Sequence, residues 1–288
     1  MTTTELPTPG IPPHRAARKI LVPRHGAIVR VTHWLNVLCF SLLLMTGAQI
    51  FNAHPRLYWG QFGADNDAAW LSIDSIQTPT GTKGRVRLGP LSLNTTGVLG
   101  ASLEDGSLTA RAFPAWLTIP SYQDLAAGRR WHFFFAWLFV LNGVVYLGSG
   151  LLKRHFGKDL WPTRSDLAPA RLWREVVDHA RLRFAHGQDA RHYNVLQKLT
   201  YLAVIFVLLP LMVLTGWTMS PGLDSAFHVL LDVFAGRASA RSIHFICASL
   251  LLAFVVVHVV MVVASGLYNN LRSMVSGQYA IDAQQDET

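Results

Sequence analysis

The stretch of residues 242–268, SIHFICASLLLAFVVVHVVMVVASGLY, decides the fold of this chain. It carries no Asp, Glu, Lys or Arg, and it is longer than the roughly 20 apolar residues that cross about 30 Å of hydrocarbon. Three other stretches are also long and apolar enough to span a membrane: residues 27–50, 130–152 and 196–220. The sequence therefore predicts an all-α membrane protein built on a four-helix transmembrane bundle.

The overall composition agrees with a membrane protein. Of the 288 residues, 51% are hydrophobic and only 15% are charged, which is unusual for a soluble domain of this length. The alternative is a large soluble core that buries four apolar helices, but such a core needs amphipathic helices around it and few are evident. The first span lacks a small-residue cleavage site, so we expect a retained signal anchor.

Lys and Arg are distributed unequally between the segments that join the spans. They are concentrated before the first span and in the loop 153–198, whereas the loop 221–241 carries only Arg237 and Arg241. By the positive-inside rule, the basic segments lie in the cytoplasm. We therefore expect a multi-pass protein of the bacterial inner membrane with both termini cytoplasmic. The net charge of +8 then reflects orientation and not binding to nucleic acid.

The segment 51–128, between the first two spans, is long enough to form a small subdomain outside the membrane. Short apolar stretches within residues 86–112 are broken by Gly, Asn and Pro, which predicts one or two β-hairpins. Aromatic residues that precede these stretches favour a folded segment over a disordered spacer. The predicted organisation is a cytoplasmic tail (1–26), a membrane domain (27–268) that contains this periplasmic insertion, and a cytoplasmic C-terminal tail (269–288).

Four of the twelve histidines lie within predicted spans: His33, His132, His244 and His258. An ionisable side chain is costly at that depth, so each is a candidate for function. His244 and His258 share the last span and are separated by just under four helical turns. They therefore face nearly the same way and lie about 21 Å apart along the helix axis. One histidine is thus expected near each side of the membrane.

Each of these two histidines has a predicted partner at the same depth. His33, early in the first span, is level with His258, and His132, at the start of the second span, is level with His244. A b-type haem needs two axial imidazoles from opposite sides of its ring. The sequence therefore predicts two haem b groups, with iron bound by the pairs His33/His258 and His132/His244. Interhelical hydrogen bonds, or a proton relay in a haem-free transporter, are the alternatives.

The residues around these histidines form a characteristic set. The four spans open on Arg30-Val31-Thr32-His33-Trp34, Arg129-Arg130-Trp131-His132, Tyr193-Asn194-Val195-Leu196-Gln197-Lys198 and Arg241-Ser242-Ile243-His244. This combination resembles the bacterial cytochrome b561 family, which includes the di-haem cytochrome b subunits of nickel-iron hydrogenase, formate dehydrogenase and thiosulfate reductase. The resemblance covers all four spans and implies the same histidine pairing.

The resemblance also implies a quinone site. Residues 193–198 are similar to the family segment that meets quinone near the cytoplasmic haem. By that match, Asn194 is the candidate for a hydrogen bond to a quinone carbonyl, with Gln197 and Lys198 nearby. The alternative for Asn194 is an ordinary N-cap of the third span.

Two arginines are predicted near the outer haem. Arg129 and Arg130 stand just before His132 at the outer start of the second span. They are candidates for pairing with the haem propionates, because a guanidinium binds a carboxylate through two parallel hydrogen bonds. The alternative is that they anchor the helix at the membrane interface.

Together these features predict an electron-transfer protein with no catalytic side chain of its own. It would move electrons between the membrane quinone pool and a periplasmic redox enzyme subunit, in either direction. The long outer loop is similar to that of relatives thought to serve periplasmic molybdopterin oxidoreductases, which implies a partner of that kind. The alternative is a stand-alone superoxide:quinone oxidoreductase in the same fold, which a basic, open outer surface would favour.

Overall fold

The computed structural model describes residues 19–63, 67–79, 81–104, 106–154, 156–157, 161–181 and 194–282. Four helical runs in it are long and apolar enough to cross a membrane, which confirms the four predicted spans. The first two are α1 (Ala27–Phe51) and α2 (Leu125–Leu152), and the last is α8 (Arg237–Ala264). The third run covers Val195–Met219.

The third run is continuous but changes its winding midway. It consists of α4 (Val195–Ala203), the π-helical turn η4 (Val204–Leu208) and α5 (Leu209–Met219). Pro210 is the second residue after the π turn, and a proline inside a helix has no N–H to donate and crowds the carbonyl one turn earlier. The wider π turn accommodates this defect without ending the span.

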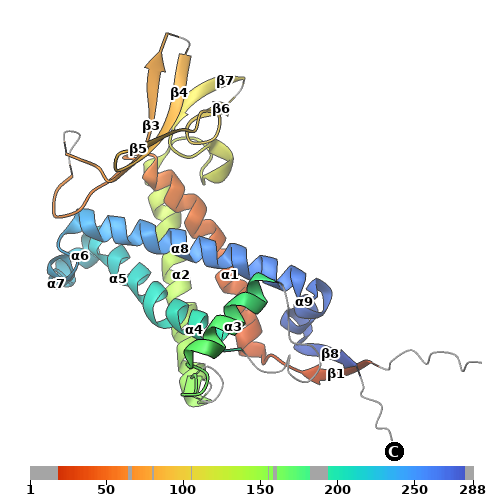
Figure 1. Ribbon diagram of the computed structural model, residues 1–288. Helices are drawn as coiled ribbons and strands as arrows, with labels where there is room; N and C mark the ends of the chain where they lie inside the picture. The colour runs from red at the N-terminus through yellow and green to blue at the C-terminus, as the bar shows by residue number, and fades with distance from the viewer. Residues whose placement is uncertain are drawn as a thin grey trace, which may run out of the picture.

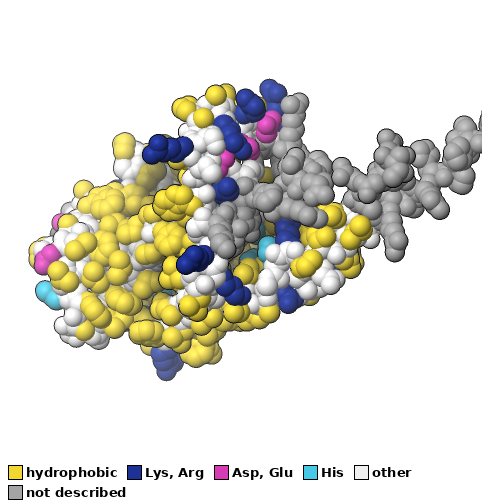
Figure 2. Space-filling model, turned by 90° about the horizontal axis from the view of Figure 1, so that it is seen from below, with side chains coloured by type: hydrophobic (Ala, Val, Ile, Leu, Met, Phe, Trp, Pro, Cys, Tyr) yellow, Lys and Arg dark blue, Asp and Glu magenta, His cyan; other side chains and the backbone are white. Residues whose placement is uncertain are grey.

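The spans form two closely packed pairs. α1 packs on α2, and α5 packs on α8, whereas within the described residues the two pairs approach each other less closely (Figure 1). Asn142 of α2 joins the first pair, because its buried amide donates to the Thr32 carbonyl at 2.8 Å and to the Asn36 side chain at 2.7 Å. Exposed hydrophobic side chains cover much of the helices, as contact with lipid requires (Figure 2).

The segment between α1 and α2 folds into small antiparallel sheets. One sheet has the order β2 (Arg56–Leu57), β3 (Leu71–Thr78), β4 (Gly81–Leu88) and β5 (Leu91–Asn94), and β6 (Gly100–Glu104) pairs with β7 (Ser107–Arg111). The β6–β7 hairpin lies where hairpins were predicted, but β3 was not foreseen. The all-α prediction is therefore incomplete, because this mostly helical chain also forms strands.

This sheet subdomain is fastened to the end of α1 by a shared apolar core and by polar contacts. Phe51, the last residue of α1, packs with Leu57, Leu71 and Ile73. The buried guanidinium of Arg111 donates to the side chains of Gln49 on α1 and of Thr118, at 2.9 and 2.6 Å, and to the Ser121 carbonyl at 2.5 Å. The position of the sheets relative to the bundle is thus set by specific contacts.

The opposite end of the bundle joins the beginning and the end of the described chain. β1 (Lys19–Pro23) pairs antiparallel with β8 (Gln278–Asp282), which follows the short helix α9 (Leu267–Ser276). Trp34 of α1 donates to the Met274 carbonyl at 3.0 Å. Residues 269–282 of the segment predicted as a C-terminal tail therefore belong to α9 and β8, and both ends of the described chain lie on one side of the bundle (Figure 1).

Among the described residues, short helices occupy the other connections. α3 (Pro169–Ala180) precedes the third span, and α6 (Pro221–Ala226) and α7 (Val229–Val233) lie between α5 and α8. A 3-10 turn, η1 (Ala115–Leu117), leads from the sheets toward α2.

Candidate haem-binding site

The structure brings the four intramembrane histidines together as two facing pairs. His33 of α1 faces His258 of α8, with ring centroids 6.4 Å apart and ring planes at 56°. His132 of α2 faces His244 of α8, also at 6.4 Å, with planes at 60°. These are the pairs predicted from depth along the spans, and α8 contributes one ring to each.

The spacing within each pair fits a single metal ion between the two rings. Metal–imidazole bonds are about 2 Å long, so two of them account for roughly 4 Å of the distance between centroids, and the two half-rings span the rest. No group of three or more His, Cys, Asp or Glu that could hold a metal occurs among the described residues. Two opposed imidazoles without further protein ligands suit a haem iron, because the porphyrin supplies the other ligands.

The pair nearer the sheets, His132 and His244, is called the outer pair. Each of its two rings is oriented by a buried threonine. Thr46 Oγ1 lies 3.0 Å from His132 Nδ1, and Thr215 Oγ1 lies 3.0 Å from His244 Nδ1. Each hydroxyl donates to a carbonyl of the preceding helical turn, at 2.7 Å from Leu42 and 2.5 Å from Leu211. The hydroxyl therefore accepts from the ring, so Nδ1 carries the proton and Nε2 is left as the metal-binding nitrogen.

The two threonines that hold these rings, here called the threonine tethers, are each followed by a glycine. Gly47 follows Thr46 on α1, and Gly216 follows Thr215 on α5. A Cβ at Gly47 would lie 3.5 Å from His132 Cε1, and one at Gly216 would lie 3.6 Å from His244 Cε1. In each Thr-Gly pair, the threonine hydroxyl thus accepts a hydrogen bond from the histidine ring, and the glycine, which has no side chain, leaves space beside that ring.

The other pair, His33 and His258, is called the inner pair and has a different environment. His33 Nδ1 is buried and has no hydrogen-bond partner among the residues that the structure describes. Its ring meets Trp34 edge-on at 5.3 Å, while the ring of His258 stacks on Phe254 at 5.9 Å. Aromatic packing therefore holds the inner rings, whereas hydrogen bonds hold the outer ones.

Asn194, the first predicted quinone residue, is the N-cap of α4. Its side chain accepts from the Gln197 N–H at 2.9 Å, and the Gln197 side chain accepts from the Asn194 N–H at 3.4 Å, which completes a capping box. The structure thus shows the capping role that was the alternative. A role in binding quinone stays a prediction for Asn194 and Gln197.

Lys198, the third predicted quinone residue, forms an ion pair with Asp166 at 3.4 Å. The backbone N–H of Thr163 donates to this carboxylate and, together with Lys198, holds the pKa of Asp166 below its usual range. The pair therefore stabilises the fold at neutral pH, and this contribution is lost as the pH falls through the lowered pKa of Asp166. Tyr193 and His192, which precede Asn194, lie outside the described residues.

A row of aromatic rings links this region to the inner histidines. Tyr201 of α4 meets Phe254 at a centroid distance of 6.4 Å, and Phe254 stacks on His258. The end of the third span that carries Asn194 therefore belongs to the same side of the bundle as the inner pair.

The predicted propionate partners Arg129 and Arg130 are exposed near the start of α2. Arg241 of α8 is more buried than either and lies three residues before His244. Its guanidinium donates to the His54 carbonyl and lies over the Phe51 ring, 5.5 Å from the centroid. Arg241 was not among the predicted site residues, although its i, i+3 spacing to His244 was a signal for it.

The family described as prokaryotic cytochrome b561 matches residues 24–277, which include all four spans and all four histidines. The chain belongs to this family. It is a multi-pass cytochrome b561 of the inner membrane that binds haem b and takes part in electron transport.

A relative of this cytochrome b561 occurs in Azospira oryzae and is provisionally named as YedZ1, a subunit of a protein-methionine-sulfoxide reductase. The two are 28% identical over 238 residues, which cover 83% of this chain and 89% of the relative. No solved structure matches the chain.

Proposed function

We propose that this cytochrome b561 holds two haem b groups, one between His33 and His258 and the other between His132 and His244. The observation that carries the proposal is the recurrence of one geometry, two imidazoles with centroids 6.4 Å apart, at two depths of the bundle. When bound, the haems supply one-electron chemistry at both depths. No catalytic side chain is required, because the protein binds, orients and insulates the redox groups.

We further propose that electrons pass between membrane quinone at the inner pair and a redox enzyme at the outer pair. The Lys- and Arg-rich segments favour a cytoplasmic location for the β1–β8 end and a periplasmic one for the sheets. The aromatic contacts from α4 to His258 support a quinone site on the inner side. Asn194, Gln197 and Lys198 are its proposed residues.

The proposed partner is a periplasmic oxidoreductase subunit of the molybdopterin-dependent kind. Two observations support a protein partner over direct oxidation of superoxide. The Azospira oryzae relative is itself named as a reductase subunit. The segment between α1 and α2 also folds into sheets that share an apolar core with the end of α1, and these sheets offer a surface on which an enzyme could dock.

The function is tested in proteoliposomes that contain the purified holoprotein. A membrane-soluble quinol is expected to reduce the haems, and ferricyanide outside the vesicles is expected to reoxidise them through the outer face. Haem that quinol cannot reduce would contradict the proposed link to the quinone pool.

Asn194 offers a variant pair that separates capping from quinone binding. Asn194→Ser keeps a capping oxygen but removes the amide, whereas Asn194→Ala removes both and costs about 1 kcal/mol of helix stability. If the amide binds quinone, both variants are expected to raise the quinol concentration for half-maximal haem reduction by about fivefold, because a hydrogen bond is worth roughly 1 kcal/mol. An effect of Asn194→Ala alone would assign Asn194 to capping only.

The threonine tethers are expected to set the reduction potential of the outer haem. A donated Nδ1–H makes the imidazole a stronger base, which favours the ferric state. Thr46→Val or Thr215→Val is therefore expected to raise that potential by on the order of 40 mV, for a hydrogen bond of about 1 kcal/mol. A redox titration followed in the visible spectrum measures it. Thr200→Val, which removes a similar hydroxyl bonded to Leu196, is the control, and equal shifts in all three variants would contradict the assignment.

A further inference from the structure

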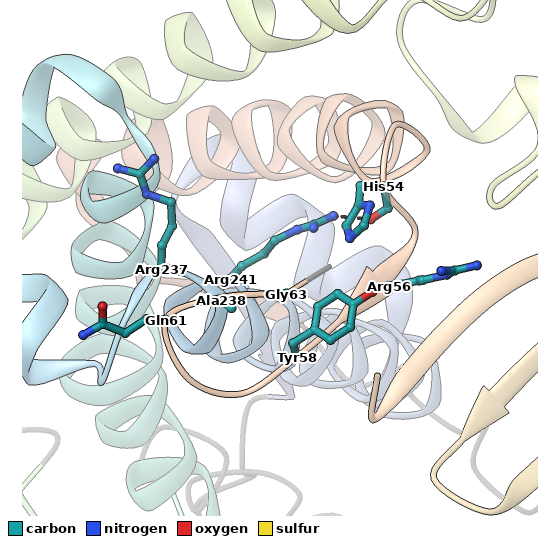
Figure 3. A pocket seen from close by; sticks show the side chains of 8 residues that line it. All are labelled: His54, Arg56, Tyr58, Gln61, Gly63, Arg237, Ala238 and Arg241. Atoms are coloured by element: carbon teal, nitrogen blue, oxygen red, sulfur yellow. Dashed lines mark hydrogen bonds between the residues drawn. The ribbon is translucent and has the colours of Figure 1, made fainter. Parts of the chain in front are cut away.

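A cavity of about 210 Å³ opens at the outer end of the bundle, where the chain leaving α1 crosses the first turns of α8. Figure 3 shows the Arg241 side chain extending toward His54, with Arg237 and Arg56 at opposite edges. The described lining residues are His54, Arg56, Tyr58, Gln61, Gly63, Arg237, Ala238 and Arg241.

The cavity is strongly basic. Three of its eight described lining residues are arginines and none is acidic. Arg237 at the edge has a counter-ion, because it pairs with Asp224 at 2.5 Å. Arg241 contacts a carbonyl and an aromatic ring but pairs with no carboxylate within the part of the chain that the structure describes. A partly buried cation without a counter-ion is costly, so this arrangement suits the binding of an anion.

Tyr58 provides a second, independent indication of a ligand. Its side chain lines the cavity and is only 5% exposed, yet its hydroxyl has no hydrogen-bond partner among the described residues. The Tyr58 ring packs closely against Gly63, because a Cβ added to this glycine would lie only 2.4 Å from a ring atom. The Tyr58 carbonyl also accepts a hydrogen bond from the Ser242 hydroxyl at 2.6 Å, so the position of Tyr58 is fixed. Buried hydroxyls are normally satisfied, so an acceptor from outside the described chain is expected here.

We infer that this cavity binds a carboxylate through the Arg241 guanidinium and the Tyr58 hydroxyl. A guanidinium presents a fork of N–H donors that matches the two oxygens of a carboxylate, and the phenol adds one more donor. Arg241 is three residues before His244, so its Cα is about 4.5 Å away along the axis and on a similar side of α8.

Two sources can supply this carboxylate. One is a propionate of the haem proposed between His132 and His244, and this source rests on the proposed function. The other is a small carboxylate that enters from the aqueous side. Both would be bound by the same donors, but the two sources predict different effects of the substitutions on the haem midpoint potential and on acetate binding.

The test compares Arg241→Gln and Tyr58→Phe with the control Arg87→Gln, a sheet arginine outside the cavity, in the purified holoprotein. If a propionate is bound, both cavity variants keep their haem but lower the midpoint potential of the outer haem and change its pH dependence, because a lost donor leaves the carboxylate charge uncompensated. Added acetate then has no effect. Tyr58→Phe keeps the test informative if Arg241→Gln fails to fold.

If the carboxylate comes from outside, acetate is expected to change the tryptophan fluorescence of the wild type saturably, and both variants weaken its binding about tenfold or more. This readout does not require haem, so it remains valid if the proposed haem ligation is wrong. Unchanged midpoint potentials together with no acetate response in the wild type would overturn the inference.

Discussion

His244→Ala is expected to remove the outer haem, and His258→Ala the inner one, so that each variant retains about half the haem of the wild type. An alanine cannot ligate iron, and the facing histidine alone supplies only one of two axial bonds. Both positions are on α8, and their rings face His132 and His33. Each substitution should therefore remove only one of the two haems, although α8 carries both histidines.

The measurement is a pyridine haemochrome count with a reduced-minus-oxidised visible spectrum for each purified variant. His228→Ala is the matched control, because this exposed histidine lies outside the spans and should leave the haem content unchanged. Full haem content in either α8 variant would contradict the proposed ligation. A colourless wild-type protein would remove the di-haem proposal altogether.

Arg111→Leu is expected to weaken the attachment of the outer sheets by about 3–5 kcal/mol, because removing one member of a buried charged network leaves its partners unsatisfied. Arg111 bonds to Gln49, Thr118 and Ser121, and it pairs with Glu104 at 3.4 Å. A leucine side chain cannot donate a hydrogen bond to any of these acceptors. The segment from β2 to η1 should then open far more often than in the wild type.

Proteolysis of the native holoprotein measures this opening, since cleavage follows the population of the open form when closing is fast. The expected change is a rise in the cleavage rate of roughly a hundredfold or more. Arg85→Leu is the control, because its ion pair with Asp74 is partly exposed and such pairs are worth at most about 1 kcal/mol. Similar cleavage in the two variants would contradict the role of Arg111.

The spans and the histidine pairing were predictable because both follow from one-dimensional spacing. The predicted span 27–50 ends within one residue of α1, and 130–152 ends at the last residue of α2. The α2 start was placed five residues late, because the charged Arg129 interrupts the apolar run, although Asp124 caps a helix there. The facing of His132 and His244 needed only depth and topology.

The contacts that orient the site were not predictable in the same way. Thr46 is 86 residues from His132, and Thr215 is 29 residues from His244, so no local pattern joins them. The pairing of β1 with β8 likewise joins the two ends of the described chain. Asn194 illustrates the opposite case, because an N-cap is a local feature, and the capping role given as the alternative for Asn194 is present in the structure.

Because α8 supplies one ring to each pair, both proposed haem sites depend on the helix that is synthesised after the other three spans. His33 and His132 are synthesised and inserted well before their partners, and each remains half of a site until the fourth span arrives. One helix then completes both sites. Formation of both pairs is thus coupled to the synthesis of α8, and a chain interrupted ahead of α8 carries neither pair.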